Sequence, residues 1–228
     1  MKLGRSRMDA QFNMKLSFDL KVLDEKAGPV AAGESGTLAI KLPLPPGCFP
    51  TLWNNDDGFL KSYLAQYPGY YMTGDAGYKD DGGYFYVMSR VDDIINVAGH
   101  RLSTGAIEEV IAGHADVAEC AVIGAADDIK GEVPVGFVVL KSGVHRSNEQ
   151  VIGELVERVR TTIGAFACFR SAVVVQGLPK TRSGKILRGT MKKIADGAEY
   201  SVPATIDDPA TLTIIGDRLK TIGYPGKR

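Results

Sequence analysis

A basic loop towards the C-terminal end, "LPKTRSGKILR" at residues 178–188, combines four cations with two hydroxyls, one glycine and one proline. It is not a P-loop, because Pro179 stands where the first glycine is required and Ile186 replaces the metal-binding hydroxyl after the lysine. A lysine at the tip of a Gly-Ser turn can carry a point charge to a carboxylate and a phosphate when a domain closes. Lys185 is therefore a candidate for chemistry, and a solvated basic turn is the alternative.

A second group of charged residues flanks an apolar strand in "SRVDDIINVAGHR", residues 89–101, which contains Arg90, Asp92 and Arg101. Upstream of it, "TGD" places Asp75 directly after a glycine turn. A carboxylate has two acceptor oxygens and can bind a vicinal diol such as a ribose. The alternatives are a turn aspartate and two surface arginines.

Composition predicts a globular protein with one or two cores, since 44% of the 228 residues are hydrophobic. Lys+Arg and Asp+Glu both number 27, so we expect neither nucleic acid nor a membrane as a partner. No run is typical of a transmembrane helix or a signal peptide. Cys48, Cys120 and Cys168 lack metal-ligand spacing, which favours buried thiols in a reducing compartment and no metal site.

The first part of the chain has the pattern of a β-rich segment. The expected elements are strands over 14–22 and 37–42, a short helix over 58–67, and a hairpin over 70–89 around the turn "KDDGG". In the first strand, alternation places Phe18, Leu20 and Val22 on the buried face. A first strand without an earlier partner would leave an exposed edge. We therefore expect the chain to be the C-terminal part of something longer.

After residues 90–93, helices and strands alternate. The expected elements are a helix over 103–113, strands over 117–124 and 133–141, a helix from Ser147 with the capping box "SNEQ", a strand over 171–176 and a basic helix from about Leu187. We predict an α/β (α+β) fold, with a β-rich part over 1–91 and a small α/β domain with a short central sheet over 92–228.

The order of "YYMTGD", "SRVDDIINVAGHRLSTGAIEE", "AECAVIG", "LPKTRSGKILR" and "TIDDP" resembles the C-terminal part of short-chain acyl-CoA synthetases, within the superfamily of adenylate-forming ligases. The second motif looks more like propionyl-CoA synthetases and their mitochondrial short-chain relatives than like acetyl-CoA synthetases. The resemblance implies that residues 1–91 end a large AMP-binding domain and that residues 92–228 form its mobile C-terminal domain.

The resemblance also implies a reaction in two steps. A carboxylate attacks the α-phosphate of Mg²⁺-bound ATP, which gives an acyl-adenylate and pyrophosphate; after the small domain rotates, the thiol of coenzyme A takes the acyl group and AMP leaves. In the first step Asp75 and Arg90 would bind the ribose, and Lys185 would bridge the carboxylate and the α-phosphate. Asp92 would be the hinge.

In the second step Gly99 would let the pantetheine arm pass, Arg101 would approach the nucleotide phosphate, and Arg160 would hold a phosphate of coenzyme A. Three residues match a cation-binding turn of bacterial relatives, namely Ala112, His114 and Val117. We favour a structural role there, because only His114 offers a ligand side chain.

The triphosphate loop and the acid pocket of the family have no counterpart in this stretch, so we expect the chain alone to be an incomplete enzyme that needs the missing N-terminal part. One alternative is a stand-alone module that binds coenzyme A or AMP through Arg160, Arg101 and Asp75. Another is an acidic or RNA partner for residues 180–193, which we disfavour because no aromatic residues interleave the cations. Cytoplasm and mitochondrial matrix fit equally, and Lys185 is a candidate for regulatory acylation.

Overall fold

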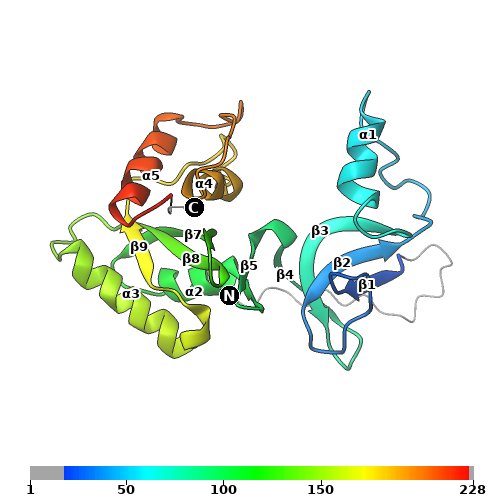
Figure 1. Ribbon diagram of the computed structural model, residues 1–228, viewed down its shortest axis with the longest axis horizontal. Coiled ribbons are helices and arrows are strands. Elements are labelled where there is room, and N and C mark those ends of the chain that lie inside the picture. The colour runs from blue at the N-terminus through cyan, green and yellow to red at the C-terminus, as the bar shows by residue number, and fades with distance from the viewer. Residues whose placement is uncertain (1–17, 226–228) are drawn as a thin grey trace. The chain divides into compact units, whose positions relative to one another are not determined.

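The computed structural model describes residues 18–225 of the chain (Figure 1). It divides into two compact units, an N-terminal unit that ends at Asp92 and a C-terminal unit that begins at Asp93. In the described residues no helix combines the length and the apolar character needed to cross a membrane.

The N-terminal unit contains a four-stranded antiparallel sheet in the order β1-β2-β3-β4. Its strands are β1 Leu20–Leu23, β2 Gly36–Lys41, β3 Tyr70–Lys79 and β4 Phe85–Arg90. The strand expected over 14–22 falls partly outside the described residues, and its described part begins only at Leu20. Phe18 is 43% exposed, which corrects its predicted place on the buried face. The strand is shorter than the alternation suggests because pairing with β2 starts at Leu20.

The helix expected over 58–67 begins earlier and ends earlier. It consists of α1 Asp56–Phe59 followed by a π-helical turn at Leu60–Leu64. It begins early because the Asn55 side chain caps it, accepting a hydrogen bond from the amide of Gly58 at 3.0 Å. The predicted hairpin is confirmed by the antiparallel pairing of β3 with β4.

The C-terminal unit is built on a five-stranded sheet in the order β6-β5-β8-β7, in which β9 pairs in parallel with β8. The strands are β5 Ile94–Val97, β6 His100–Ser103, β7 Val117–Asp127, β8 Gly131–Leu140 and β9 Ser171–Val174. The helices are α2 Thr104–Ala112, α3 Asn148–Thr162, α4 Arg188–Ala195 and α5 Ala210–Thr221, with short 3₁₀ turns at Val91–Asp93 and Ala165–Ala167.

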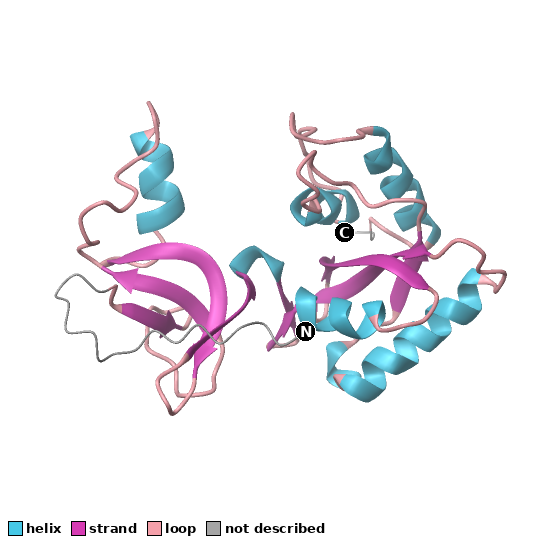
Figure 2. Ribbon diagram, turned by 180° about the vertical axis from the view of Figure 1, so that it is seen from behind, coloured by secondary structure: helices cyan, strands magenta, loops and turns pink. Residues whose placement is uncertain are grey.

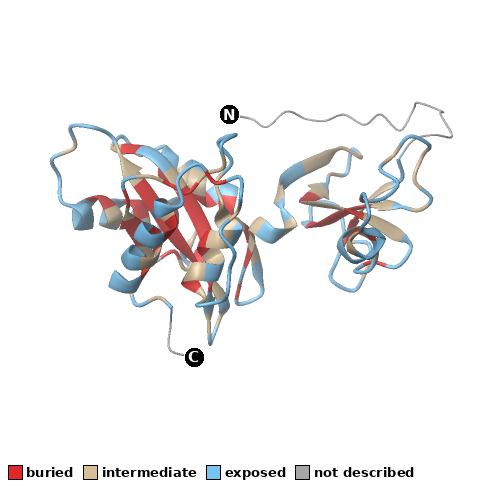
Figure 3. Ribbon diagram, turned by 90° about the horizontal axis from the view of Figure 1, so that it is seen from above, coloured by how far each residue is buried: buried red, intermediate tan, exposed pale blue. Residues whose placement is uncertain are grey.

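The helices cover both faces of this sheet, as Figure 2 shows for the central strands. Val122 and Val138 pack with α2 and α3 in one buried cluster, whereas Ile123 and Phe137 pack with α4 and α5 in another. Successive strand residues point to opposite faces, so both sides of β7 and β8 are apolar. The buried residues accordingly concentrate on these strands (Figure 3). The predicted α/β fold with a central sheet is confirmed.

The capping box predicted at the start of α3 is present. The Ser147 hydroxyl accepts from the amide of Gln150 at 3.3 Å, and the Gln150 side chain accepts from the amide of Ser147 at 3.4 Å. Helix α3 buries Val151, Leu155 and Val159 on one side. Helix α3 therefore forms from local signals that the packing then reinforces.

Candidate functional site

Asp75 and Arg90 lie directly opposite one another on β3 and β4. Arg90 Nη1 is 3.3 Å from Asp75 Oδ1, and the same nitrogen donates to the carbonyl oxygen of Thr73 at 3.3 Å. The side chains keep 49% and 37% of their surface exposed, so both remain accessible to a ligand. The hairpin therefore brings together a carboxylate and a guanidinium that can bind a polar ligand from two sides.

The backbone around Asp75 is fixed by its two preceding residues. Gly74 has a φ of +79°, and a Cβ built there would lie 2.5 Å from the guanidinium of Arg90. The Thr73 hydroxyl donates to the carbonyl of Leu38 at 2.7 Å and accepts from the amide of Asp75 at 3.1 Å. Glycine thus suits the left-handed backbone at position 74, and a Cβ there would displace the guanidinium of Arg90.

Asp92 lies in the 3₁₀ turn that ends the N-terminal unit. Its Oδ1 is 3.4 Å from Nε of Arg90, and its side chain is 74% exposed. Arg90 therefore contacts two carboxylates, one from the β3 site and one from the segment that leads into the C-terminal unit. An exposed pair of this kind contributes only about 0–1 kcal/mol.

Gly99 and Arg101 belong to the β5–β6 hairpin of the C-terminal unit. Ala98 and Gly99 form its turn with φ angles of +48° and +87°. A Cβ built at Gly99 would meet nothing within 4 Å, so the tip is open. Arg101 is half-buried on β6, and the amide of Ala98 donates to the carbonyl of Lys130 at 2.8 Å, which attaches the hairpin to the start of β8.

Arg160 occupies the last turn of α3, where a cation interacts favourably with the helix dipole. It lines a pocket of about 210 Å³ together with Gly164, Cys168, Phe169 and Arg170. The pocket joins an apolar wall to two guanidinium groups, which suits a ligand with an apolar part and an anionic group.

Lys185 stands on a tight hairpin that several backbone hydrogen bonds hold in place. The amide of Thr181 donates to the carbonyl of Lys185 at 2.8 Å, and the amide of Gly184 donates to the carbonyl of Thr181 at 2.8 Å. The amide of Lys185 donates to the Thr181 hydroxyl at 3.1 Å. The Lys185 side chain is exposed and forms no ion pair with any residue in 18–225. The tip of this hairpin is therefore a turn held by hydrogen bonds, from which the ammonium group of Lys185, unpaired among the described residues, projects.

The base of this hairpin is attached to the sheet by two ion pairs. Lys180 lies 2.7 Å from a carboxylate oxygen of Glu119 on β7. Arg188 donates to both carboxylate oxygens of Glu108 on α2, at 2.9 and 2.8 Å. Glu108 also accepts from the amide of Val122 at 2.8 Å, which satisfies a backbone group on the outer edge of β7. The sequence gives no signal for this pair, because its members are 80 residues apart.

The cysteines are free thiols of intermediate exposure, which corrects the prediction of buried thiols. Cys120 sits beside the Glu108–Arg188 pair and donates to the carbonyl oxygen of Glu108 at 3.4 Å. Burial, with the charge of Glu108 adding to it, raises the pKa of the Cys120 thiol to about 11. This thiol is therefore protonated at neutral pH.

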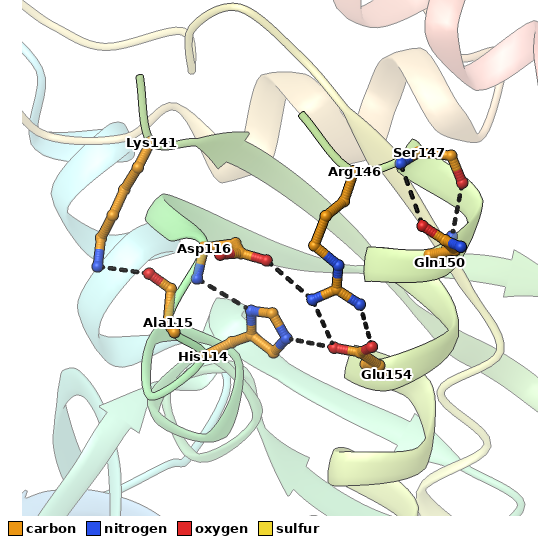
Figure 4. A network of polar contacts seen from close by, with 8 residues as sticks. All are labelled: His114, Ala115, Asp116, Lys141, Arg146, Ser147, Gln150 and Glu154. Atoms are coloured by element: carbon orange, nitrogen blue, oxygen red, sulfur yellow. Dashed lines mark hydrogen bonds and ion pairs between the residues drawn. The ribbon is translucent and has the colours of Figure 1, made fainter. Parts of the chain in front are cut away.

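His114 takes part in a polar network between α2 and α3 (Figure 4). The amide of Asp116 donates to its Nδ1 at 3.2 Å, so Nε2 carries the proton and donates to Glu154 at 3.0 Å. Arg146 pairs with both Asp116 and Glu154, and the hydrogen bonds from Arg146 and then from His114 lower the pKa of Glu154 to about 2. The turn at Ala112, His114 and Val117 thus has a structural use, and no group of three or more His, Cys, Asp or Glu in residues 18–225 is placed to hold a metal.

Comparison with known families identifies the class of the C-terminal unit. Residues 106–185 match the family of the AMP-binding enzyme C-terminal domain. The match begins in α2 and ends at Lys185 on its hairpin. This part of the chain is therefore similar to the AMP-binding enzyme C-terminal domain.

The relatives of the whole chain define it more closely. It is 56% identical over 200 residues to an uncharacterized protein of Pseudomonas aeruginosa, an alignment that covers 88% of this chain and 31% of the relative. It is 51% identical over 203 residues to the mitochondrial acyl-CoA synthetase short-chain family member 3 of Mus musculus, with coverages of 89% and 30%. The resemblance to short-chain acyl-CoA synthetases is confirmed, over a chain that spans less than a third of these relatives.

A solved structure supports the fold. The acetoacetyl-CoA synthetase from Streptomyces lividans aligns with a TM-score of 0.75 and covers 90% of this chain and 31% of its own, at 22% identity. At that identity the likeness establishes the fold alone.

Proposed function

We propose that this chain is the C-terminal part of an ATP-dependent short-chain carboxylate–CoA ligase, with the end of the adenylation domain over residues 1–91 and the C-terminal domain over 92–228. The observation that carries the proposal is the exposed cation of Lys185, which has no ion-pair partner in residues 18–225 and stands at the end of the segment that matches the AMP-binding family. The Asp75–Arg90 pair supports it from the other unit.

In the first step, Lys185 lowers the barrier that arises when an anionic carboxylate approaches the anionic α-phosphate of ATP. The hydrogen-bonded hairpin holds its backbone, so little conformational freedom is lost when the charge is placed. Asp75 accepts hydrogen bonds from the ribose hydroxyls, and Arg90, held by Thr73 and Asp75, orients this carboxylate. Mg²⁺ arrives with the triphosphate as part of the substrate.

In the second step, the C-terminal domain turns about Asp92, and the β5–β6 hairpin replaces the Lys185 hairpin at the reacting atoms. The exposed Arg90–Asp92 pair costs at most about 1 kcal/mol to break, so it does not lock the hinge. The open tip at Gly99 leaves room for the pantetheine arm. Arg101 approaches the nucleotide phosphate, and Arg160 holds a phosphate of coenzyme A.

The remaining parts of the enzyme follow from the same proposal. An N-terminal partner segment supplies the triphosphate loop and the acid pocket. The acid is short, with propionate favoured by the motif around Asp92, and the compartment is the cytoplasm or the mitochondrial matrix. The mouse relative is named as a mitochondrial protein, which supports the mitochondrial alternative.

The length of the native polypeptide tests this proposal. Tryptic peptides of the chain are detected after size separation of an extract from the source cell. We expect them to migrate with a protein of more than about twice the 24.4 kDa of this chain. Migration at 24.4 kDa would contradict it and favour a stand-alone module.

The stand-alone module is the second candidate, and the pocket beside Arg160 is the observation that favours it. Calorimetry of the isolated chain with coenzyme A and with AMP tests it directly. If the chain binds coenzyme A or AMP, and Arg160→Ala or Asp75→Asn weakens that binding, the result would support the stand-alone module. Absence of binding for both nucleotides would exclude it.

A further inference from the structure

A larger groove in the C-terminal unit lies between α3 and α5, and it shares Val156 and Arg170 with the pocket beside Arg160. Its volume is about 680 Å³. Ile152 and Gly153 of α3 line one wall, Arg218 and Ile222 line the opposite wall, and β9 forms the floor. This volume is within the range of sites that bind ligands, roughly 300–1,000 Å³.

The floor of the groove is an unpaired strand edge. Within residues 18–225, β9 pairs with β8 and with no other strand. The amide of Val175 donates to the carbonyl of Val138 at 2.9 Å, so the backbone groups of every second residue of β9 face β8. The backbone N–H and C=O groups of Ala172 and Val174 consequently point away from β8, towards the groove. A free edge of this kind is a template for one more strand.

The flanking helices decide what can reach this edge. Because α3 and α5 both line the groove, β9 is recessed between them, and the equally recessed β9 of a second copy could not pair with it. A single extended peptide is narrow enough. Gly153 widens the groove: it lies inside α3, its φ is not positive, and a Cβ built there meets nothing within 4 Å. Glycine inside a helix costs about 0.5–1 kcal/mol relative to alanine, and no local conformation requires it here.

The charges of the groove indicate the chemistry of the peptide. Arg170 and Arg218 both line it and are exposed, and neither forms an ion pair with a described residue. Glu149 is the single acidic residue of the lining. Ile152 and Ile222 supply the apolar part. The groove therefore suits an extended segment with apolar side chains between carboxylates.

We propose that the groove between α3 and α5 is a docking site for an extended acidic peptide of a partner protein, which binds as a further strand on the free edge of β9. Gly99 and Lys185 are not among the residues that line this groove. The proposal does not depend on the ligase function.

The test uses the 228-residue chain and a fluorescent six-residue probe, Glu-Val-Thr-Val-Asp-Val, in fluorescence anisotropy. We expect saturable binding, weakened about tenfold by Arg218→Ala through loss of one charge-assisted contact. Gly153→Leu fills the groove and abolishes binding. Gly189→Leu is the matched control, because Gly189 is also an exposed helical glycine with nothing within 4 Å of a built Cβ, and it should bind like the unaltered chain.

Two control peptides separate the components of the proposal. A peptide with N-methylated amides should bind at least about tenfold more weakly, because strand addition needs its N–H donors. Replacement of both acids by lysine should abolish binding. Equal binding of either control, unchanged binding by Gly153→Leu, or no binding of the probe at millimolar concentration would overturn the proposal. Dimerisation of the chain that Gly153→Leu abolishes would do so too, since a second copy would then occupy the groove.

Discussion

The ion pair between Glu108 and Arg188 gives the sharpest stability prediction. Its side chains are 16% and 23% exposed, and Glu108 accepts three hydrogen bonds, two from Arg188 and one from the amide of Val122. Glu108→Ala leaves a largely buried guanidinium without its partner and a backbone amide without its acceptor. Removing one member of a buried pair costs about 3–5 kcal/mol. The partial exposure places the expected loss at the lower end, about 3 kcal/mol.

Calorimetric unfolding of the chain measures this loss. A destabilisation of about 3 kcal/mol lowers the midpoint of the C-terminal transition by roughly 6–12 °C for a chain of this size. Glu108→Gln keeps an acceptor for Val122 and should lose about 1–2 kcal/mol. Glu157→Ala is the control and should stay within about 0.5 kcal/mol, because Glu157 is exposed and, among the described residues, its carboxylate accepts only from the Thr161 hydroxyl. A loss below about 1 kcal/mol for Glu108→Ala would refute this reasoning.

Three further predictions concern single groups. Gly74→Ala in the native enzyme should weaken ATP binding, because its Cβ displaces Arg90. Gly83→Ala is the control: its φ of +82° is similar, but its built Cβ lies 3.8 Å from the nearest atom, so it should cost stability alone. Equal ATP affinity in the two variants would contradict this. The pKa of Glu154 is lowered from 4.5 to about 2, so its stabilising contribution is present above pH 4.5 and is lost as the pH falls towards 2. Urea titrations between pH 4.5 and 2 should therefore show that the free energy of unfolding falls less steeply with pH for Glu154→Gln than for the unaltered chain. Iodoacetamide at pH 8 should alkylate Cys120 about a hundredfold more slowly in the folded chain than in urea, and equal rates would argue against a protonated thiol.

The elements that the sequence predicts well carry their own local signals. Helix α3 begins at a capping box and keeps its apolar spacing, and the β3–β4 hairpin has a Gly-rich turn between two alternating runs. Helix α5 is different, and no element was predicted there. Its "TLTII" run is rich in β-branched residues with low helix propensity. It is helical because Leu212, Ile215 and Leu219 are buried on one side.

The candidate site shows the same division. The contact between Asp75 and Arg90 follows from the register of one hairpin, so motifs near in sequence predicted residues that are near in space. The two ion pairs that attach the Lys185 hairpin to the sheet could not be predicted, because Glu108 and Glu119 come from other parts of the sheet and its helices. Contacts between distant segments depend on the tertiary fold and leave no periodic signal in the sequence.

Separate assay of the two half-reactions in the native polypeptide that contains this chain tests the central claim most directly. Lys185→Ala should reduce ATP–pyrophosphate exchange by at least about a hundredfold, the usual effect of removing one charge-stabilising donor. It should leave thioester formation from supplied acyl-adenylate within about threefold of the unaltered enzyme. Lys193→Ala, which removes another exposed cation from α4, should change neither step. Equal losses in both half-reactions for Lys185→Ala, or unchanged exchange, would contradict the role of Lys185 in adenylation.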